Sequence, residues 1–202
     1  MTGHWISYGR WAIGVGLAAL LSINLVAAER FNAASQPTTV DATRIVIERS
    51  TGDRTLDGRA YSGTAITHFP NGDLAKSEQF VDGRREGVLR MWFANGNLAF
   101  ESRYRKGRRM GATVSWWANG AKRSETYYAD DKPDGISWHW YSTGAPYKRY
   151  SYAAGQPVGL QKAWRKNGKL YSNFEYRNGR AYGLRNANLC VELNDEQIFD
   201  EI

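Results

Sequence analysis

The chain has 202 residues, 42% of them hydrophobic and 23% charged, and its 27 Lys and Arg against 20 Asp and Glu give a formal net charge of +7 at pH 7. This is the size of one domain with an ordinary soluble composition, apart from a content of 21 Gly, 8 Trp and 12 Tyr that favours turns and strands. The only cysteine is Cys190, which excludes an internal disulfide, so the fold must rest on packing and hydrogen bonds.

The first 28 residues predict an export segment. Arg10 precedes an apolar run, residues 11 to 28, that ends in VAA, a small-residue cleavage site, before Glu29. Such a run is typical of a cleaved signal peptide, and at about 1.5 Å per helical residue it is also long enough for a retained anchor of roughly 27 Å. Both alternatives place the rest of the chain outside the cytoplasm, in the periplasm or cell envelope, and the second holds it at the inner membrane. No cysteine comes directly after the run, which excludes a bacterial lipoprotein anchor.

A linker and a single domain are expected after this segment. Residues 29 to 44 are polar and lack hydrophobic periodicity, which predicts a solvated linker. The domain is expected to begin near Ile45 and to extend to residue 193, followed by an acidic tail over residues 194 to 202. Apolar stretches at residues 45 to 49 and 189 to 193 are the expected end strands.

Glycines recur every 24 residues and divide the domain into units. Five complete units begin at Gly63, Gly87, Gly111, Gly135 and Gly159, and Gly183 begins a partial sixth unit. Each unit has an aromatic or His pair just before an Asn-Gly-type turn, as in MWFANG at residues 91 to 96 and SWWANG at residues 115 to 120. Asn-Gly is a strong hairpin signal, because a two-residue type I′ turn needs positive φ at both positions, which Asn tolerates and Gly adopts freely. Each unit is therefore predicted to be a hairpin, such as residues 88 to 94 paired with 97 to 105.

A second glycine-marked turn follows an aromatic residue in each unit and connects one hairpin to the next. These aromatic residues are Phe80, Tyr104, Tyr128, Tyr152 and Tyr176. A single hairpin is not stable alone in water, whereas stacked hairpins bury a continuous apolar row. The sequence thus predicts an all-β fold, a single-layer antiparallel meander of stacked 24-residue β-hairpin repeats, behind an N-terminal signal or anchor helix. Asp131 stands where the other units have Gly, and Thr143 where they have Asn, so those two turns are expected to differ locally.

The pattern G-x4-aromatic-aromatic-x-N-G, followed by Tyr/Phe-x-x-G-x-x-x-G, resembles the MORN repeat, and more closely its bacterial variant, the YwqK-type toxin-antitoxin antitoxin family. The resemblance covers residues 63 to about 187. It implies a non-enzymatic interaction module: a scaffold, a phospholipid or membrane associate, or a partner that neutralises a toxin. An antitoxin against a cytoplasmic toxin should carry no export signal, so residues 11 to 28 argue against that specific role.

Few residues could carry catalysis or hold a metal. Cys190 with His139 as its base would make a nucleophile pair, but nothing in the sequence places them together, and a strand-buried thiol is the preferred interpretation. The acid pairs at residues 130–131 and 195–196 are interpreted as solvated carboxylates. With one Cys and no H-x-x-x-H or C-x-x-C spacing, no metal site and no cofactor is expected. The chain is predicted not to be an enzyme, and a hydrolase is the weakest alternative.

Cations concentrate in two neighbouring inter-hairpin turns. They are Arg84, Arg85, Arg105, Lys106, Arg108 and Arg109. Stacking would place them on one edge of the sheet, where they would attract polyanions or anionic lipid headgroups, at about 1 kcal/mol per residue near a charged membrane and less at high salt. The alternative is that long cations keep the turns soluble and deter edge-to-edge aggregation. Nucleic acid is not expected as a partner, because of the export segment.

Aromatic residues supply a second candidate surface. One repeat position holds Trp92, Trp116, Trp140 and Trp164, which are expected to pack as a ladder on the concave face of the sheet. The residues that follow them point the opposite way because side chains alternate along a strand. Phe93, Trp117 and Tyr141 therefore form a candidate exposed stripe for a protein, peptide or glycan partner. His68 and His139, on strands leading into the turns, are interpreted as packed or half-exposed imidazoles rather than as ligands.

Together these features predict an exported or membrane-anchored binding or scaffolding module at the cell envelope. Its expected partner is a protein or an anionic membrane surface. An antitoxin-like inhibitor of a toxin is the alternative.

Overall fold

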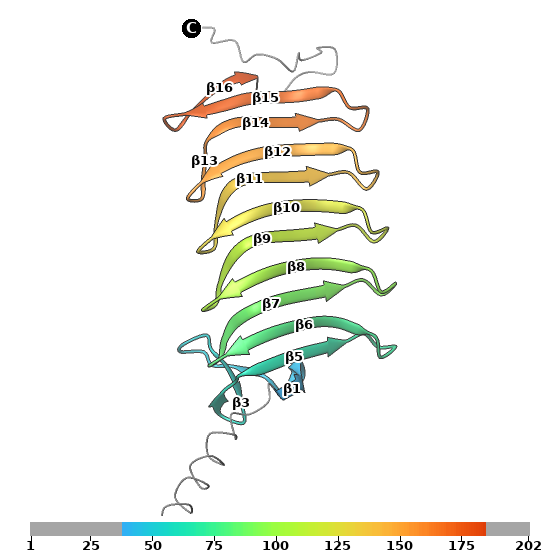
Figure 1. The fold of residues 1–202 in the computed structure, drawn as a ribbon, viewed down its shortest axis with the longest axis vertical. Helices are drawn as coiled ribbons and strands as arrows, with labels where there is room; N and C mark the ends of the chain where they lie inside the picture. Colours follow the sequence, from blue (N-terminus) through green and yellow to red (C-terminus); the bar gives the residue numbers. More distant parts are fainter. Residues whose placement is uncertain (1–37, 185–202) are drawn as a thin grey trace, which may run out of the picture. The chain divides into compact units, whose positions relative to one another are not determined.

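The computed structural model describes residues 38 to 184, which form strands and turns apart from one short 3-10 helix (Figure 1). The elements are β1 (Thr38–Asp41), η1 (Ala42–Arg44), β2 (Val46–Ile47), β3 (Arg54–Leu56), β4 (Arg59–Ala60), β5 (Gly63–His68), β6 (Leu74–Val81), β7 (Arg84–Trp92), β8 (Leu98–Arg105), β9 (Arg108–Trp116), β10 (Lys122–Ala129), β11 (Lys132–Trp140), β12 (Pro146–Ala153), β13 (Gln156–Pro157), β14 (Gly159–Trp164), β15 (Leu170–Arg177) and β16 (Arg180–Leu184). Between residues 38 and 184, no helix is long and apolar enough to cross a membrane.

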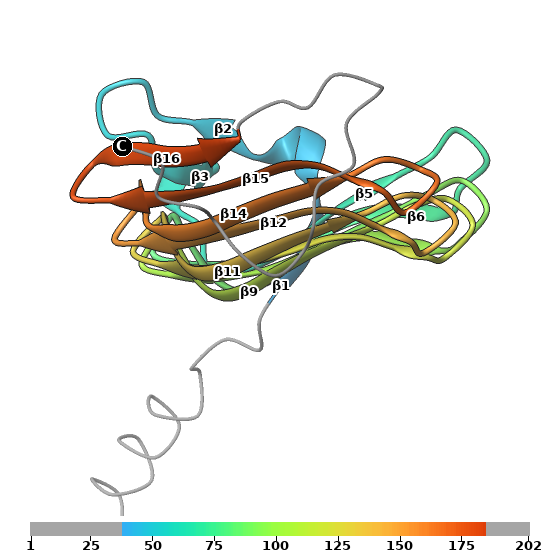
Figure 2. The same ribbon diagram turned by 90° about the horizontal axis from the view of Figure 1, so that it is seen from above.

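The main sheet follows the order of the chain. Strands β5 to β12, and then β14 to β16, lie side by side and antiparallel, while β1 lies parallel to β5 at one end and the short β13 pairs with β12. Figure 1 shows these strands stacked in sequence order, and Figure 2, viewed along the stack, shows a single layer. The predicted all-β architecture of consecutive hairpins is confirmed. The predicted N-terminal helix lies outside the described residues.

The glycine that begins each unit lies opposite the aromatic residue that closes the same hairpin. The pairs are Gly63 with Phe80, Gly87 with Tyr104, Gly111 with Tyr128, Gly135 with Tyr152, and Gly159 with Tyr176. In the second unit Gly87 has a φ of 92° and lies in a bulge of β7 against β6. An L-residue rarely adopts this conformation, and the same irregularity recurs at Gly111 and Gly135, so the 24-residue glycine period records a bulge in the second, third and fourth units.

The Asn-Gly turns close hairpins as predicted, but they are not type I′ turns. Around Asn95 only Gly96 has a positive φ, and Gly96 N donates to Phe93 O at 2.9 Å while Phe93 N donates to Asn97 O at 2.9 Å. This is a three-residue loop, a type I turn followed by a left-handed glycine. Asn suits it for a reason other than positive φ, because its Oδ1 accepts a hydrogen bond from Asn97 N at 3.1 Å. The five such loops, residues 69–73, 93–97, 117–121, 141–145 and 165–169, are called loops 1 to 5, and together they form the loop edge.

The type I′ turns lie at the opposite ends of the hairpins, which we call the turn edge. Their central residues, all with positive φ, are Asp82-Gly83, Lys106-Gly107, Asp130-Asp131, Ala154-Gly155 and Asn178-Gly179. Asp131 keeps this conformation at a φ of 65°, so the predicted local difference at that turn is wrong. Thr143 also keeps its loop, although Ala145 N donates to its Oγ1 at a longer distance of 3.4 Å. Figure 1 shows the turn edge on the left of the sheet and the loop edge on the right.

The N-terminal boundary of the domain differs from the prediction. Residues 38 to 41, predicted to be linker, form β1, and the side chain of Val40 is 6% exposed in a core with Tyr61, Ala65 and Phe80. Val40 is the one buried residue of this strand. A single apolar residue in a polar stretch gives no hydrophobic periodicity, so the sequence did not indicate a strand here. The hydroxyl of Tyr61 also donates to Thr38 O at 2.5 Å.

The stretch of residues 45 to 49 is not an end strand of the main sheet. Its residues Val46 and Ile47 form β2, which pairs with β3 in a separate three-stranded sheet. Cys190, the export segment, the predicted strand at residues 189 to 193 and the predicted acidic tail all lie outside the described residues.

Candidate binding surfaces

The six predicted basic residues lie together on the turn edge. Arg84 and Arg85 begin β7, Arg105 ends β8, Lys106 is the first central residue of the next turn, and Arg108 and Arg109 begin β9. Main-chain hydrogen bonds join neighbouring turns, because Gly107 N donates to Arg85 O at 2.8 Å and Asp131 N donates to Arg109 O at 3.1 Å. Stacking therefore brings these cations close together, as the 24-residue period predicts.

Four of the six cations form ion pairs with carboxylates of the same chain. The pairs are Arg84 with Asp53 at 3.3 Å, Arg85 with Glu78 at 2.9 Å, Arg108 with Asp130 at 2.9 Å, and Arg109 with Asp131 at 3.1 Å. Of the two interpretations that the sequence leaves open, attraction of an anionic partner requires these cations to be available. Their charges are instead largely compensated inside the domain.

The ion pair between Arg109 and Asp131 shifts the pKa of both residues. Hydrogen bonds from the backbone and side chain of Arg109, with its charge, lower the pKa of Asp131 although partial burial opposes this. Burial lowers the pKa of Arg109, but the hydrogen bond and charge of Asp131, with nearby Tyr128, outweigh it and raise the pKa. The guanidinium also lies 4.1 Å from the centre of the Tyr128 ring. Arg109 is therefore a structural residue that joins two repeats.

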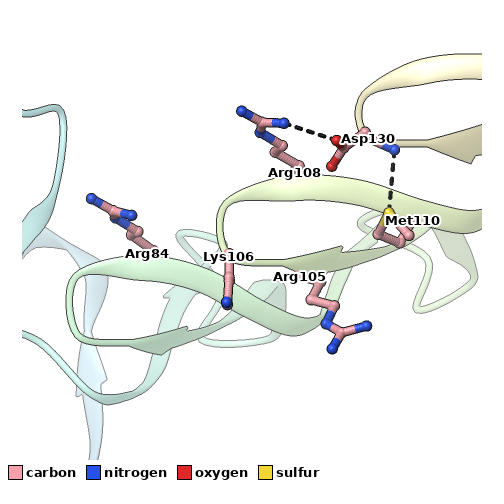
Figure 3. Close-up of a pocket in the computed structure, with 6 residues that line it drawn as sticks. All are labelled: Arg84, Arg105, Lys106, Arg108, Met110 and Asp130. Atoms are coloured by element: carbon pink, nitrogen blue, oxygen red, sulfur yellow. Dashed lines mark hydrogen bonds and ion pairs between the residues drawn. The ribbon is translucent and has the colours of Figure 1, made fainter.

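Arg105 and Lys106 differ from the other four cations. Both are exposed, and among residues 38 to 184 no carboxylate side chain forms an ion pair with either. They line a recess of about 410 Å³, whose other lining residues are Arg84, Arg108, Met110 and Asp130. Figure 3 shows Arg108 turned toward Asp130 on the next turn, while Arg105 and Lys106 point away from that pair.

Sequence reasoning missed two residues of this recess. Met110 is one of its lining residues, and its Sδ accepts a hydrogen bond from Asp130 N at 3.2 Å. Asp130 is an exposed turn carboxylate, as the sequence suggests, but it also pairs with Arg108 and is the one carboxylate among the lining residues of the recess. The separation of 22 residues between Arg108 and Asp130 is close to the repeat period, and this signal could have identified the pair.

The predicted aromatic stripe is half-buried rather than exposed. Trp117 Nε1 donates to Trp140 O at 3.1 Å, and the hydroxyl of Tyr141 donates to Trp164 O at 2.9 Å. Phe93 occupies the same position one repeat earlier and is also half-buried. The side chains of Trp117 and Tyr141 thus connect their hairpins to the next, which gives these two positions a structural role.

The tryptophans of the other row are half-buried as well, and the row includes a member that the repeat pattern did not indicate. Trp138 stacks on Trp140, with ring centres 6.0 Å apart and planes 17° apart, and on Trp164, with ring centres 5.9 Å apart. Trp138 precedes Trp140 by two residues on β11 and therefore shares its face. Lys122 lies 5.6 Å from the Trp140 ring centre.

His139 is half-buried, as the sequence interpretation expected. Burial lowers its pKa, and the charges of Lys148 and Arg123 add to the effect. The imidazole is 3.3 Å from Ser137 Oγ, which in turn is 2.6 Å from Thr126 Oγ1, and Ser137 is 3% exposed. Among the described residues no carboxylate is hydrogen-bonded to His139, so this arrangement lacks the orienting group of a nucleophilic triad.

Comparison with known proteins identifies one repeat. Residues 85 to 106 match the family model of the MORN repeat variant. No curated protein matches the chain. Among solved structures, a mutant of TarM from S. aureus in complex with fondaparinux, alpha-GlcNAc-glycerol and UDP is similar at 13% identity and a TM-score of 0.31. That match covers 50% of this chain and 20% of the TarM chain.

Proposed function

We propose that this chain is a non-enzymatic binding module of the cell envelope that holds an anionic membrane surface through the basic recess of its turn edge. The match of residues 85 to 106 to a MORN repeat variant supports a binding module. Export, by a signal peptide or an anchor within residues 1 to 28, is part of the same proposal.

The observation that carries the proposal is the charge imbalance of the recess. Four cations and one carboxylate line it, and Arg105 and Lys106 have no ion-pair partner among residues 38 to 184. An anionic headgroup that enters the recess gains attraction from both side chains without breaking an internal ion pair. The paired residues, such as Arg109, would have to give up a carboxylate first, so they contribute less than the sequence suggests.

The test is flotation of the chain without residues 1 to 28, with vesicles of phosphatidylcholine alone or with phosphatidylglycerol added, at low and physiological salt. We expect flotation only with the anionic vesicles, and less of it as salt rises. The double variant Arg105→Gln/Lys106→Asn removes both free cations, and Asn suits the positive φ of residue 106. It should lose most of the flotation.

The matched control is the double variant Arg59→Gln/Lys166→Gln. It removes the same charge from two exposed positions outside the recess. Retained flotation in this control, together with loss in the recess variant, supports the proposal. Equal losses in both variants would mean that only the net charge matters.

A second candidate function is an antitoxin-like inhibitor, or another module that contacts a protein. It is favoured by Tyr127 and Ile136, which are 50% and 40% exposed on neighbouring strands and point to the face opposite the paired Thr126 and Ser137. If no vesicle floats the protein, pull-down with wild type and with a Tyr127→Ser/Ile136→Ser variant tests this candidate. A partner captured equally by both would exclude that face.

A further inference from the structure

Side-chain amides connect successive loops of the loop edge. Asn95 Nδ2 of loop 2 donates to Ala118 O of loop 3 at 2.8 Å, and Asn119 Nδ2 of loop 3 donates to Ser142 O of loop 4 at 2.8 Å. Asn97 adds a second bond to Ala118 O at 2.9 Å. Loops 2, 3 and 4 are thus held to one another by asparagine donors.

The contact between loops 1 and 2 lacks these bonds because of one residue. Asp73 stands where loop 2 has Asn97, and a carboxylate cannot donate to the carbonyl of the next loop. It accepts the amide of Asn71 instead, Nδ2 to Oδ2 at 2.7 Å. The amide of Asn71 is therefore engaged within loop 1, and no bond joins it to Ala94 O, the carbonyl that corresponds to Ala118 O one repeat later.

A recess of about 510 Å³ lies at this contact. It is lined by Asp73, Leu74, Trp92, Ala94, Asn95 and Gly96. Leu74 is 38% exposed, whereas Leu170, which follows loop 5 at the same repeat position, is 6% exposed. The recess thus combines an indole and an aliphatic side chain with a carboxylate.

Two hydrogen-bond acceptors of the recess are available to a ligand, the Asp73 carboxylate and Ala94 O. Asp73 forms no ion pair among the described residues, and Ala94 O receives no amide from loop 1. Two donors of the lining are already used, because Asn95 Nδ2 bonds Ala118 O and Gly96 N bonds Phe93 O. A complementary ligand must therefore donate hydrogen bonds, carry positive charge and present methylene groups to Trp92 and Leu74.

We propose that this recess binds a primary ammonium group on an aliphatic stem, supplied by a lysine side chain of a polypeptide partner. An ammonium has three separate donors for a carboxylate oxygen and a carbonyl, and it attracts the face of an indole. A guanidinium fits less well, because its planar fork pairs with two free carboxylate oxygens and Asn71 already occupies Oδ2 of Asp73. This site is independent of the basic recess on the turn edge.

The test is a heteronuclear NMR titration of the full-length chain in neutral maltoside micelles. The probes are the peptides acetyl-Ala-Lys-Ala-amide and acetyl-Ala-norleucine-Ala-amide, with pentylamine as a free amine. We expect the lysine peptide to shift the signals of Asp73, Leu74 and the Trp92 indole N–H, and to bind about tenfold more tightly than the norleucine peptide. Equal binding of both peptides, or shifts elsewhere only, would overturn the site.

The chain offers a matched pair of variants. Asp73→Asn gives loop 1 the residue that loop 2 has at this position, so the new amide should donate to Ala94 O. Lysine-peptide binding should then fall about tenfold while the fold is retained. Asn97→Asp should do the reverse and open a second recess beside Trp116, visible as new shifts at that indole. Unchanged binding in Asp73→Asn contradicts the proposal. Pentylamine binding as tightly as the lysine peptide would overturn the polypeptide source.

Discussion

The two edges of the sheet join the same repeats by different chemistry. On the turn edge, neighbouring units are joined by main-chain hydrogen bonds such as Gly107 N to Arg85 O, 2.8 Å, and Gly155 N to Pro133 O, 2.8 Å. On the loop edge each loop closes on itself, and the bonds from loops 2 and 3 to the next loop come from asparagine side chains. Main-chain bonds survive most substitutions, whereas side-chain bonds require one residue type. A single substitution can therefore remove a bond between loops on the loop edge. At Asp73 that bond is missing and a recess lies between loops 1 and 2.

The largest expected effect comes from glycines that share a conformation but differ in their surroundings. Gly83 of the turn edge has a φ of 76°, and a Cβ there would lie 2.9 Å from Arg54 O and 2.9 Å from Asp53 Cβ. Gly96 of the loop edge has a φ of 82° and nothing within 4 Å of that position. We expect Gly83→Ala to lower the free energy of unfolding by about 3 kcal/mol and Gly96→Ala by about 1 kcal/mol. Urea unfolding measures both, and equal losses would contradict the difference in packing.

The second prediction compares a buried with a more exposed carboxylate. Glu78 is 8% exposed and lies 2.7 Å from Lys76 Nζ and 2.9 Å from Arg85 Nε, whereas Glu125 pairs only with Lys122 and is more exposed. Breaking a largely buried pair leaves its partners uncompensated. At pH 7, Glu78→Gln should lower the free energy of unfolding by about 2 kcal/mol, and Glu125→Gln by less than about 1 kcal/mol.

The Glu78 effect should depend on pH in a defined direction. Burial raises the pKa of Glu78, but hydrogen bonds and charges from Lys76 and Arg85 outweigh it and lower the pKa below its ordinary value of 4.5. A lowered folded-state pKa stabilises the protein above pH 4.5, and this stability is lost as pH falls through the folded-state value. The difference between wild type and Glu78→Gln in urea unfolding should therefore shrink below pH 4.5. A constant difference down to pH 3 would assign the loss to packing.

The third prediction tests the side-chain bonds of the loop edge. Asn119 accepts from Ala121 N at 3.1 Å and donates to Ser142 O at 2.8 Å. Asn119→Ala removes both bonds and should cost about 1 to 2 kcal/mol in urea unfolding. Asn119→Asp keeps the acceptor and loses only the donor, so it should cost about half as much. If the two variants are equally destabilised, the bond between loops contributes nothing.

Much of the fold could be predicted from the sequence because a period of 24 residues fixes both strands and turns. The hairpins of residues 84 to 105 follow from it directly. The type I′ assignment of the Asn-Gly turns is wrong, because Asn favours both type I′ turns and the side-chain bond seen at Asn95. Composition alone does not separate these two roles.

The candidate sites were predicted less well, for two reasons. Arg108 and Asp130 are 22 residues apart, close to the repeat period, so the sequence could have indicated their pairing. Arg84 instead pairs with Asp53, which is 31 residues away and lies outside the repeats, so the period gives no indication of this pair. Gln161 also makes contacts that no sequence pattern indicates. Its buried side chain bonds both the main-chain N and the main-chain O of Ser151, where β12 and β14 share few main-chain pairs. By contrast, aligning Asp73 with Asn97 requires only the period, so the recess between loops 1 and 2 had a sequence signal.

The smallest expected effect is a gain in stability at Thr143, where the series of asparagines is interrupted. Thr143 keeps the loop through a long 3.4 Å bond from Ala145 N, but a threonine hydroxyl is shorter than an amide that reaches the next loop. In Thr143→Asn the new amide should donate to Lys166 O, the carbonyl that corresponds to Ser142 O, and raise the free energy of unfolding by about 0.5 to 1 kcal/mol. Thr143→Ser keeps only the hydroxyl and should gain nothing. If serine stabilises as much as asparagine, the gain comes from the loop itself, and the bond from loop to loop is not what distinguishes this edge from the turn edge.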